Sequence, residues 1–207
     1  MTAALRWAAA ANLAALSATA CYTEAPPRPE ELRGASYSQP LEKPDFVLTT
    51  TAGDTFDFRS ETDGFVTLLF FGYTHCPDVC PIHMANIAAV LRTLSRDVSK
   101  QVKVLMVTTD PARDTPERFG SWLGNFDPTF VGLIGPLDEV NRIQSQLNLP
   151  SASRYGDDDS SYTVGHSARV IAFTADNRAH VGYPFGTRQL DWAHDLPLLV
   201  KSNWEIR

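Results

Sequence analysis

The stretch Phe65–Ser95, FVTLLFFGYTHCPDVCPIHMANIAAVLRTLS, decides the fold of this chain. It begins with the apolar run Phe65–Phe71, which is short and rich in Val, Leu and Phe and therefore predicts a buried strand. Further along, apolar residues recur at helical spacing and predict a helix with one buried face. Pro81 falls in the first turn of that helix, where the missing N–H costs nothing. Two cysteines, Cys76 and Cys80, therefore lie where a buried strand gives way to a helix.

This position favours sulfur chemistry. A helix N-terminus offers free N–H groups and a positive dipole end, which stabilise a thiolate relative to a thiol. Cys76 and Cys80 are close enough in sequence to close a disulfide. They can also offer two thiolates to a soft metal, with Cu(I) favoured and zinc as its competitor. There are three alternatives to a metal site. The cysteines could form a structural disulfide or a metal-independent site for thiol–disulfide exchange. They could also serve a peroxidase in which Cys80 resolves a sulfenic acid on Cys76.

Length and composition indicate one globular domain with extensions. The chain has 207 residues, 43% of them hydrophobic, and a formal net charge of −6. That length fits one domain of ordinary size. An acidic chain without runs of Lys or Arg argues against nucleic acid as a partner. Three cysteines are too few for a disulfide-stapled fold.

The first 44 residues have the features of an export signal and a linker. Residues 1–20 combine Arg6 with an apolar run of about ten residues, which suits a signal peptide and is too short for a membrane span. They end in Ala-Thr-Ala, a cleavage signal, directly before Cys21. This order resembles a bacterial lipoprotein processing site, so we expect an exported protein anchored in the membrane by a lipid on Cys21, in the periplasm or on the outer face of the inner membrane. Plain secretion is the alternative. Residues 21–44 contain five prolines and predict a stiff, solvated linker.

Residues 45–207 predict a single α/β domain, a central mixed sheet flanked by helices with an N-terminal β-hairpin. Residues 46–48 and 55–58, and again 168–173 and 179–183, flank short polar turns and predict two hairpins. The remaining predicted elements are strands over 102–108 and 131–134, helices after Thr115, over 137–147 and over 189–204 with a break at Pro197, and a surface loop over 151–161. Alternating strands and helices indicate at least two parallel strands. Because sites form at the carboxyl ends of such strands, Cys76, Cys80 and Asp110 should share one edge of the sheet.

His166 is the third candidate metal ligand, because it precedes the apolar strand over 170–173 and follows a long polar loop; taken alone, a histidine here would more often be a polar loop residue. Two sulfurs and one imidazole suit copper, as trigonal Cu(I) or, with a water, as tetragonal Cu(II). His75 and His83 flank the cysteines, and we expect each at the surface or supporting the ligands. The remaining histidines, His180 and His194, are expected to be exposed.

Three motifs in order resemble the signature of the Sco/SenC family of copper-binding proteins. They are FGYTHCPDVCP over residues 71–81, DPARDTPE over residues 110–117, and YTVGHS over residues 162–167. The resemblance covers roughly residues 44–186. It implies a thioredoxin-like fold and a role in assembling the copper site of cytochrome c oxidase. The implied partners are the copper-bearing subunit of that oxidase and other copper chaperones.

The resemblance also assigns roles to individual residues. Cys76, Cys80 and His166 match the copper ligands of the family, in which many members carry Asp where this chain has Gly165. Within the second motif, Asp110, Arg113 and Asp114 are expected to pair within their loop and shape the rim of the site, and the resemblance implies partner docking for Asp110 and Arg113. Asp78, between the cysteines, is expected to be a turn residue that complements the helix dipole, with partner contact or a weak metal-ligand role as the alternatives. The implied function is copper delivery or thiol reduction during oxidase maturation, without substrate turnover, so an enzyme is not expected.

Overall fold

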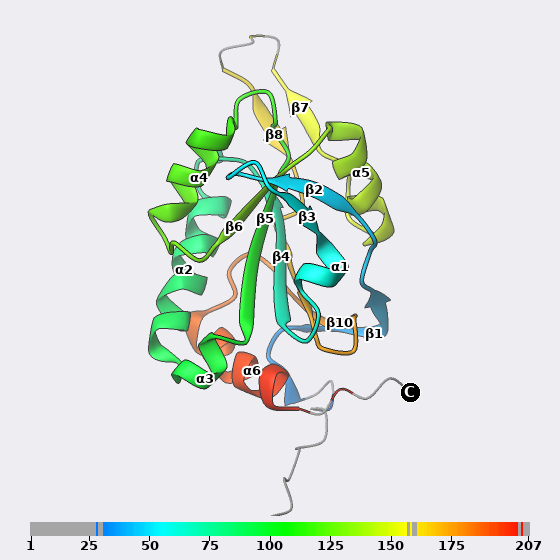
Figure 1. Ribbon diagram of the computed structural model, residues 1–207, viewed down its shortest axis with the longest axis vertical. Helices are drawn as coiled ribbons and strands as arrows, with labels where there is room; N and C mark the ends of the chain where they lie inside the picture. Colours follow the sequence, from blue (N-terminus) through cyan, green and yellow to red (C-terminus); the bar gives the residue numbers. More distant parts are fainter. Residues whose placement is uncertain (1–27, 29–30, 157, 159–160, 203, 205–207) are drawn as a thin grey trace, which may run out of the picture.

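The computed structural model describes Arg28, residues 31–156, Asp158, residues 161–202 and Trp204. The strands are β1 (Ala35–Glu42), β2 (Val47–Thr50), β3 (Thr55–Asp57), β4 (Val66–Gly72), β5 (Val102–Thr108), β6 (Val131–Ile134), β7 (Ser153–Tyr155), β8 (Thr163–Gly165), β9 (Val170–Phe173) and β10 (Arg178–Tyr183). The helices are α1 (Phe58–Glu61), α2 (Val79–Thr93), α3 (Arg96–Ser99), α4 (Pro116–Gly124), α5 (Leu137–Gln146) and α6 (Gln189–Lys201). One mixed sheet, in the order β1–β10–β9–β4–β5–β6–β2–β3, forms the centre of the molecule (Figure 1).

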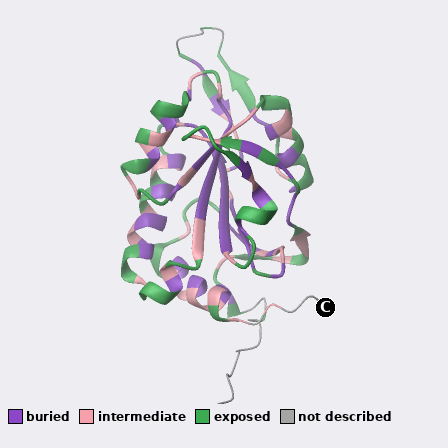
Figure 2. Cartoon of the chain, in the orientation of Figure 1, coloured by how far each residue is buried: buried purple, intermediate pink, exposed green. Residues whose placement is uncertain are grey.

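Parallel strands form the middle of the sheet. β4 pairs with β5 in parallel along its whole length, from Val66 opposite Val102 to Gly72 opposite Thr108. β6 extends this parallel unit on one side, and β9 joins β4 antiparallel on the other. Every residue of β4 is buried, as Figure 2 shows for the central strands. The predicted mixed α/β sheet with parallel central strands is therefore confirmed.

Alternate side chains of β4 enter two separate cores, one on each face of the sheet. Leu68 and Phe70 pack with buried residues of α2, α4 and α6. Leu69 and Phe71 pack on the opposite face with residues of α1 and α5. This double burial explains why the sequence of β4 is a continuous apolar run and not an alternating one.

The linker predicted over residues 21–44 is wrong for its second half. Residues 35–42 form β1, which pairs antiparallel with β10 and begins the domain before Asp45. Pro40 lies where the register of this pair shifts between Ser36 and Leu41, a bulge that accommodates a residue without an N–H. Lys43 is buried with only 1% of its surface exposed, so the segment is part of the domain and not a solvated spacer.

Two further predictions need correction. Residues 151–161 are not wholly a surface loop, because β7 pairs with β8 and so forms the arm that leads to His166. Pro197 does not break the last helix, since α6 runs without interruption from Gln189 to Lys201. Buried residues of α6 pack in the same core as α2, which offsets the backbone hydrogen bond that proline removes. Both predicted hairpins are confirmed. No helix in the described part has the length and apolar character to cross a membrane.

Candidate metal centre

Two cysteines that are close in sequence and one distant histidine meet at the carboxyl end of β4. Cys76 lies in the loop after β4, Cys80 in the first turn of α2, and His166 directly after β8. The two Sγ atoms and one ring nitrogen all lie within 4.8 Å of one another. The Cys80 Sγ is 3.5 Å from the His166 Nε2. The structure thus brings together the three residues that the sequence singled out.

The two cysteines have different environments. Both are free thiols in the structure. Cys76 is 8% exposed and Cys80 is fully buried. The Cys80 thiol donates to the Cys76 sulfur, which lowers the pKa of Cys76 to about 3, and the His166 ring and the Cys80 N–H add to this effect. The Cys80 N–H lies 3.5 Å from that sulfur. Burial raises the pKa of Cys80. The pair therefore combines a stable thiolate near the surface with a thiol beneath it.

Helix α2 begins at this point because Asp78 caps it. The Asp78 carboxylate accepts a hydrogen bond of 2.7 Å from the Val79 N–H at the helix start. The side chain is otherwise exposed to solvent. The expected role as a turn and helix-dipole residue is the one that the geometry supports.

The His166 ring is oriented for a ligand role. Its Nδ1 donates to the Ser167 carbonyl oxygen at 2.9 Å, which holds the ring with its Nε2 toward the sulfurs. A histidine ligand generally needs such a hydrogen bond on its other nitrogen. The rings of Phe70 and Tyr73 meet the imidazole edge to face, with centroids 5.8 and 5.6 Å away. The apolar rings exclude water from one side of the site.

Gly72 makes room for the buried sulfur. A Cβ added at this residue, the last of β4, would lie 2.6 Å from the Cys80 Sγ and 2.8 Å from the Phe70 ring. Both distances are below any ordinary contact, so a side chain at residue 72 would displace the sulfur or the strand. The motif over residues 71–81 contains Gly72, but the sequence alone suggested no role for it. This glycine is a part of the site that the sequence analysis missed.

A closed set of contacts joins the second motif to the arm that carries His166. The Asp110 carboxylate accepts a hydrogen bond of 2.6 Å from the Tyr162 hydroxyl and another from the Arg113 Nε. The Arg113 guanidinium also donates to the Tyr162 carbonyl oxygen at 3.0 Å and stacks 3.5 Å from the centre of its ring. Nearby, the Val164 N–H donates to the Tyr73 hydroxyl at 3.2 Å. Asp110 and Arg113 are thus engaged inside the fold, and their role in partner docking stays a prediction.

A second buried carboxylate fixes the loop between β4 and Cys76. Asp114 accepts hydrogen bonds from the Thr74 hydroxyl and the Thr108 hydroxyl, each at 2.6 Å. The Thr74 N–H also donates to it, at 3.1 Å. Since Thr108 ends β5, this contact ties the ends of the two central parallel strands together just before the loop that carries Cys76.

The other histidines lie outside the cluster of donor atoms. His75 is exposed at the surface, which is one of the two positions expected for it. His83 is 2% exposed, and its Nε2 lies 2.9 Å from the Ala168 carbonyl oxygen, so a surface position is wrong for it. His180 and His194 are half-buried and not exposed, because each lies 2.8 Å from a carboxylate, of Asp176 and Asp195 respectively. Cys21 lies outside the described residues.

The donor set fits a small soft metal ion. Donors that share one ion at about 2.2 Å in a trigonal arrangement lie about 3.8 Å apart. The observed separations, up to 4.8 Å with 3.5 Å for the sulfur–nitrogen pair, allow such a centre after small side-chain movements. Two sulfurs and one imidazole favour copper, whereas structural zinc normally takes four protein ligands.

Comparison with known proteins identifies the family. The family model described as SCO1/SenC matches residues 34–201. The structure of Bradyrhizobium japonicum ScoI with copper bound is 31% identical, with a TM-score of 0.68, and the alignment covers 77% of this chain and 99% of that one. Yeast Sco1 with copper bound is 25% identical, with a TM-score of 0.72, over 80% of this chain and 91% of that one.

The curated relatives are longer than the matched part of this chain. The mitochondrial SCO2 homologue of Danio rerio is 32% identical over 152 residues, which are 72% of this chain and 52% of that protein. Across this relative and a bacterial one, the chain spans about half to two thirds of the relatives' length. The matched structures confirm the predicted thioredoxin-like α/β fold. The chain belongs to the SCO1/SenC family.

Proposed function

We propose that this chain binds one copper ion through Cys76, Cys80 and His166 and delivers it during assembly of the copper site of cytochrome c oxidase. The observation that carries the proposal is the convergence of these three donor atoms within 4.8 Å. The copper-bound structures of Bradyrhizobium japonicum ScoI and yeast Sco1 support it, at 31% and 25% identity. The copper-bearing subunit of the oxidase and other copper chaperones are the partners that family membership implies.

The surroundings of the site suit the release of a metal as well as its binding. Two ligands come from the rigid junction of β4 and α2, whereas His166 follows the short β7–β8 arm. Cys76 and His166 lie nearer the surface than Cys80, so an incoming ligand from a partner meets them first. An exchange of ligands at this edge needs no opening of the core.

A second candidate function uses the same sulfurs without metal. The Cys76 thiolate can attack a disulfide of a partner and release one of the partner's sulfurs as a thiolate. The Cys80 thiol then loses its proton and displaces the other sulfur, which leaves a Cys76–Cys80 disulfide and a reduced partner. The lowered pKa of Cys76 beside the Cys80 thiol favours this reaction. Thiol–disulfide exchange does not require His166, whereas copper binding does. The effect of replacing His166 therefore separates the two candidate functions.

Export and lipid anchoring through Cys21 belong to the same proposal. They rest on the sequence of residues 1–21 alone. Mass spectrometry of the membrane fraction tests them, because a lipidated Cys21 adds acyl mass to a chain shortened by 20 residues. A Cys21→Ser chain should leave the membrane fraction.

The copper proposal is tested by anaerobic Cu(I) titration of the reduced chain against a chromophoric competitor. The parent should bind one copper, and both Cys80→Ser and His166→Ala should bind it more weakly. His75→Ala is the matched control, since this histidine is adjacent to Cys76 but outside the donor cluster, and it should bind as the parent does. A parent without tight copper would leave the thiol–disulfide exchange function as the better account. In that case His166→Ala should exchange with glutathione disulfide at the parental rate.

A further inference from the structure

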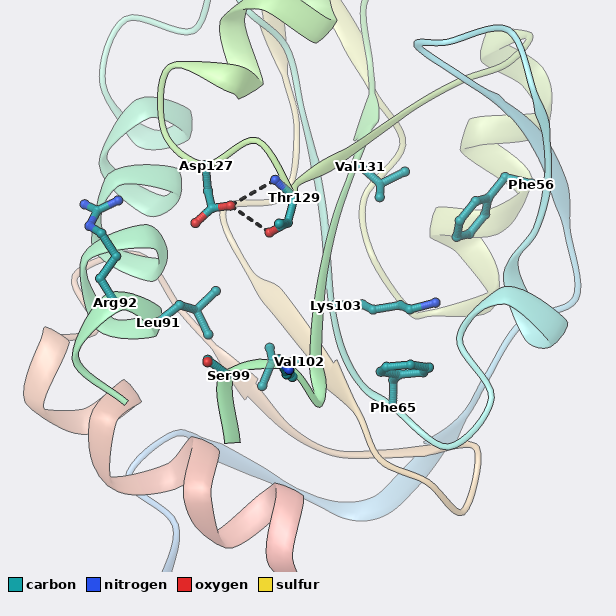
Figure 3. A pocket seen from close by; sticks show the side chains of 11 residues that line it. Phe56, Phe65, Leu91, Arg92, Ser99, Val102, Lys103, Asp127, Thr129 and Val131 are labelled. Carbon is teal, nitrogen blue, oxygen red and sulfur yellow. Dashed lines mark hydrogen bonds between the residues drawn. The ribbon is translucent and has the colours of Figure 1, made fainter. Parts of the chain in front are cut away.

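A second concave site lies at the end of the sheet opposite to the metal centre (Figure 3). β6 begins with Val131 opposite Leu105, so in the described part Val102–Val104 have a neighbouring strand on the β4 side only. The resulting notch has a volume of about 450 Å³. Its apolar surface includes Phe65, Leu91 and Val102. We call this notch the basic groove, because of the charges described next.

The charges of the basic groove contrast with those of the whole chain. The net charge of the protein is −6. Nevertheless Arg92, Lys100 and Lys103 line the groove, and Asp127 is the one acidic side chain among its described lining residues. The Asp127 carboxylate is already engaged, since it accepts hydrogen bonds from the Thr129 N–H at 2.9 Å and hydroxyl at 2.7 Å. Arg92 and Lys100 are exposed, and the Arg92 guanidinium also donates to the Phe126 carbonyl oxygen at 3.2 Å.

Apolar and cationic groups are interleaved in this groove. The Lys103 ammonium lies 4.1 Å from the centre of the Phe65 ring. The Arg92 guanidinium, at the end of α2, lies on the other side of β5 (Figure 3). A cationic rim around an apolar floor matches a ligand with an anionic head and an apolar body.

The start of the described chain lies at the same end of the molecule. The N–H groups of Arg33 and Gly34 donate to the Asp195 carboxylate of α6, at 3.0 and 2.9 Å. α6 also contacts α3, which leads into β5 beside the groove (Figure 1). Cys21 precedes Arg28 by seven residues, and seven extended residues span at most about 25 Å. A lipid on Cys21 would therefore hold this end close to the bilayer.

We propose that the basic groove docks on the anionic phospholipids of the membrane, with Arg92 and Lys100 against the phosphates and the apolar floor against the glycerol and upper acyl region. The proposal rests on the membrane location put forward above. Docking here would direct the metal centre away from the lipid surface. The seven residues of β4 separate the two ends by about 20 Å. The site would then face partners that stand off the membrane.

The test uses the full chain with Cys21→Ser, so that no lipid anchor contributes. Its partition is measured on vesicles of phosphatidylcholine alone and of phosphatidylcholine with phosphatidylglycerol, at low and at physiological salt. Each cation near an anionic surface strengthens binding about fivefold, so Arg92→Gln with Lys100→Gln should weaken it about 25-fold. The preference for phosphatidylglycerol should fall as salt rises. Lys100→Glu is a second variant, for the case that the double variant folds poorly. It changes one exposed residue and should also weaken binding to the vesicles.

The matched control is Arg118→Gln with Arg142→Gln, which removes the same charge from exposed residues of α4 and α5. It should bind vesicles within about twofold of the parent. Equal loss in both double variants would overturn the proposal in favour of a general charge effect. The proposal would also be overturned if the chain showed no preference for phosphatidylglycerol. The same holds if the groove bound an acidic peptide and the chain did not bind vesicles. Copper titration of the same variants keeps this result separate from the function of the metal centre, since groove variants should bind copper as the parent does.

Discussion

Replacement of Gly72 by alanine should loosen copper binding through a shift of one sulfur. The added Cβ would lie 2.6 Å from the Cys80 Sγ, whereas ordinary contacts begin near 3.5 Å, so about 1 Å of movement is required. The sulfur has little room, because Cys80 is fully buried. Overpacking of this kind costs about 1–3 kcal/mol of folding free energy. Loss of support for a metal ligand costs about 10–100-fold in affinity.

The assay is an anaerobic Cu(I) competition titration, beside urea unfolding of the reduced, metal-free chain. Gly132→Ala is the matched control, because its Cβ would lie 2.7 Å from the Thr51 Cγ2 and 2.9 Å from Leu123, away from the sulfurs. Both variants should lose similar stability, and only Gly72→Ala should lose copper affinity. Parental copper affinity in Gly72→Ala, or an equal loss in both variants, would refute the account of Gly72 as the space for the sulfur.

Three further predictions concern the scaffold. Burial lowers the pKa of Lys43 to about 8 from 10.5, so the folded state binds fewer protons than the unfolded state between these values. The free energy of unfolding should therefore rise by up to about 3 kcal/mol from pH 8 to pH 10.5, and Lys43→Met should remove this rise in urea titrations. Asp195→Ala should destabilise the chain by about 3–5 kcal/mol in the same assay, because it leaves donors such as the buried Tyr183 hydroxyl unpaired; a loss below 1 kcal/mol would contradict this. Gly165→Ala should cost less than about 1 kcal/mol, because its Cβ would meet the ring of Tyr155, which is 62% exposed and can move. That cost should vanish in a Tyr155→Ala background, and its persistence there would place the strain elsewhere.

Local patterns were sufficient to predict the centre of the fold and the position of the two cysteines at the start of a helix. β4 is a continuous apolar run because it is buried on both faces, and such a run is visible in sequence. The helix after the cysteines has both its apolar period and a capping aspartate, Asp78. The position of Asp110 at the same edge follows from parallel pairing alone. His166 needed the family resemblance, because 86 residues separate it from Cys80.

The parts that sequence did not predict depend on tertiary pairing. β1 has mostly exposed or half-buried residues and contains Pro40, so neither alternation nor apolar content indicates a strand. β7 is fully exposed and exists only through its pairing with β8. His83 is buried because Phe70 and Phe185 flank its ring, at centroid distances of 5.2 and 5.8 Å, and because a backbone carbonyl satisfies it. Apart from β7 and β8, these partners are distant from one another in sequence.

The pairing of β1 with β10 also protects the protein from self-association. β1 is the outermost strand on its side of the sheet, and it carries a proline and a bulge, both of which discourage a further strand from adding. A chain shortened to begin at Asp45 would leave β10 as the outermost strand. β10 has buried apolar residues and no proline, so its free backbone groups would be open to pairing with other copies. Such a chain is expected to form aggregates, even though its metal ligands are all present.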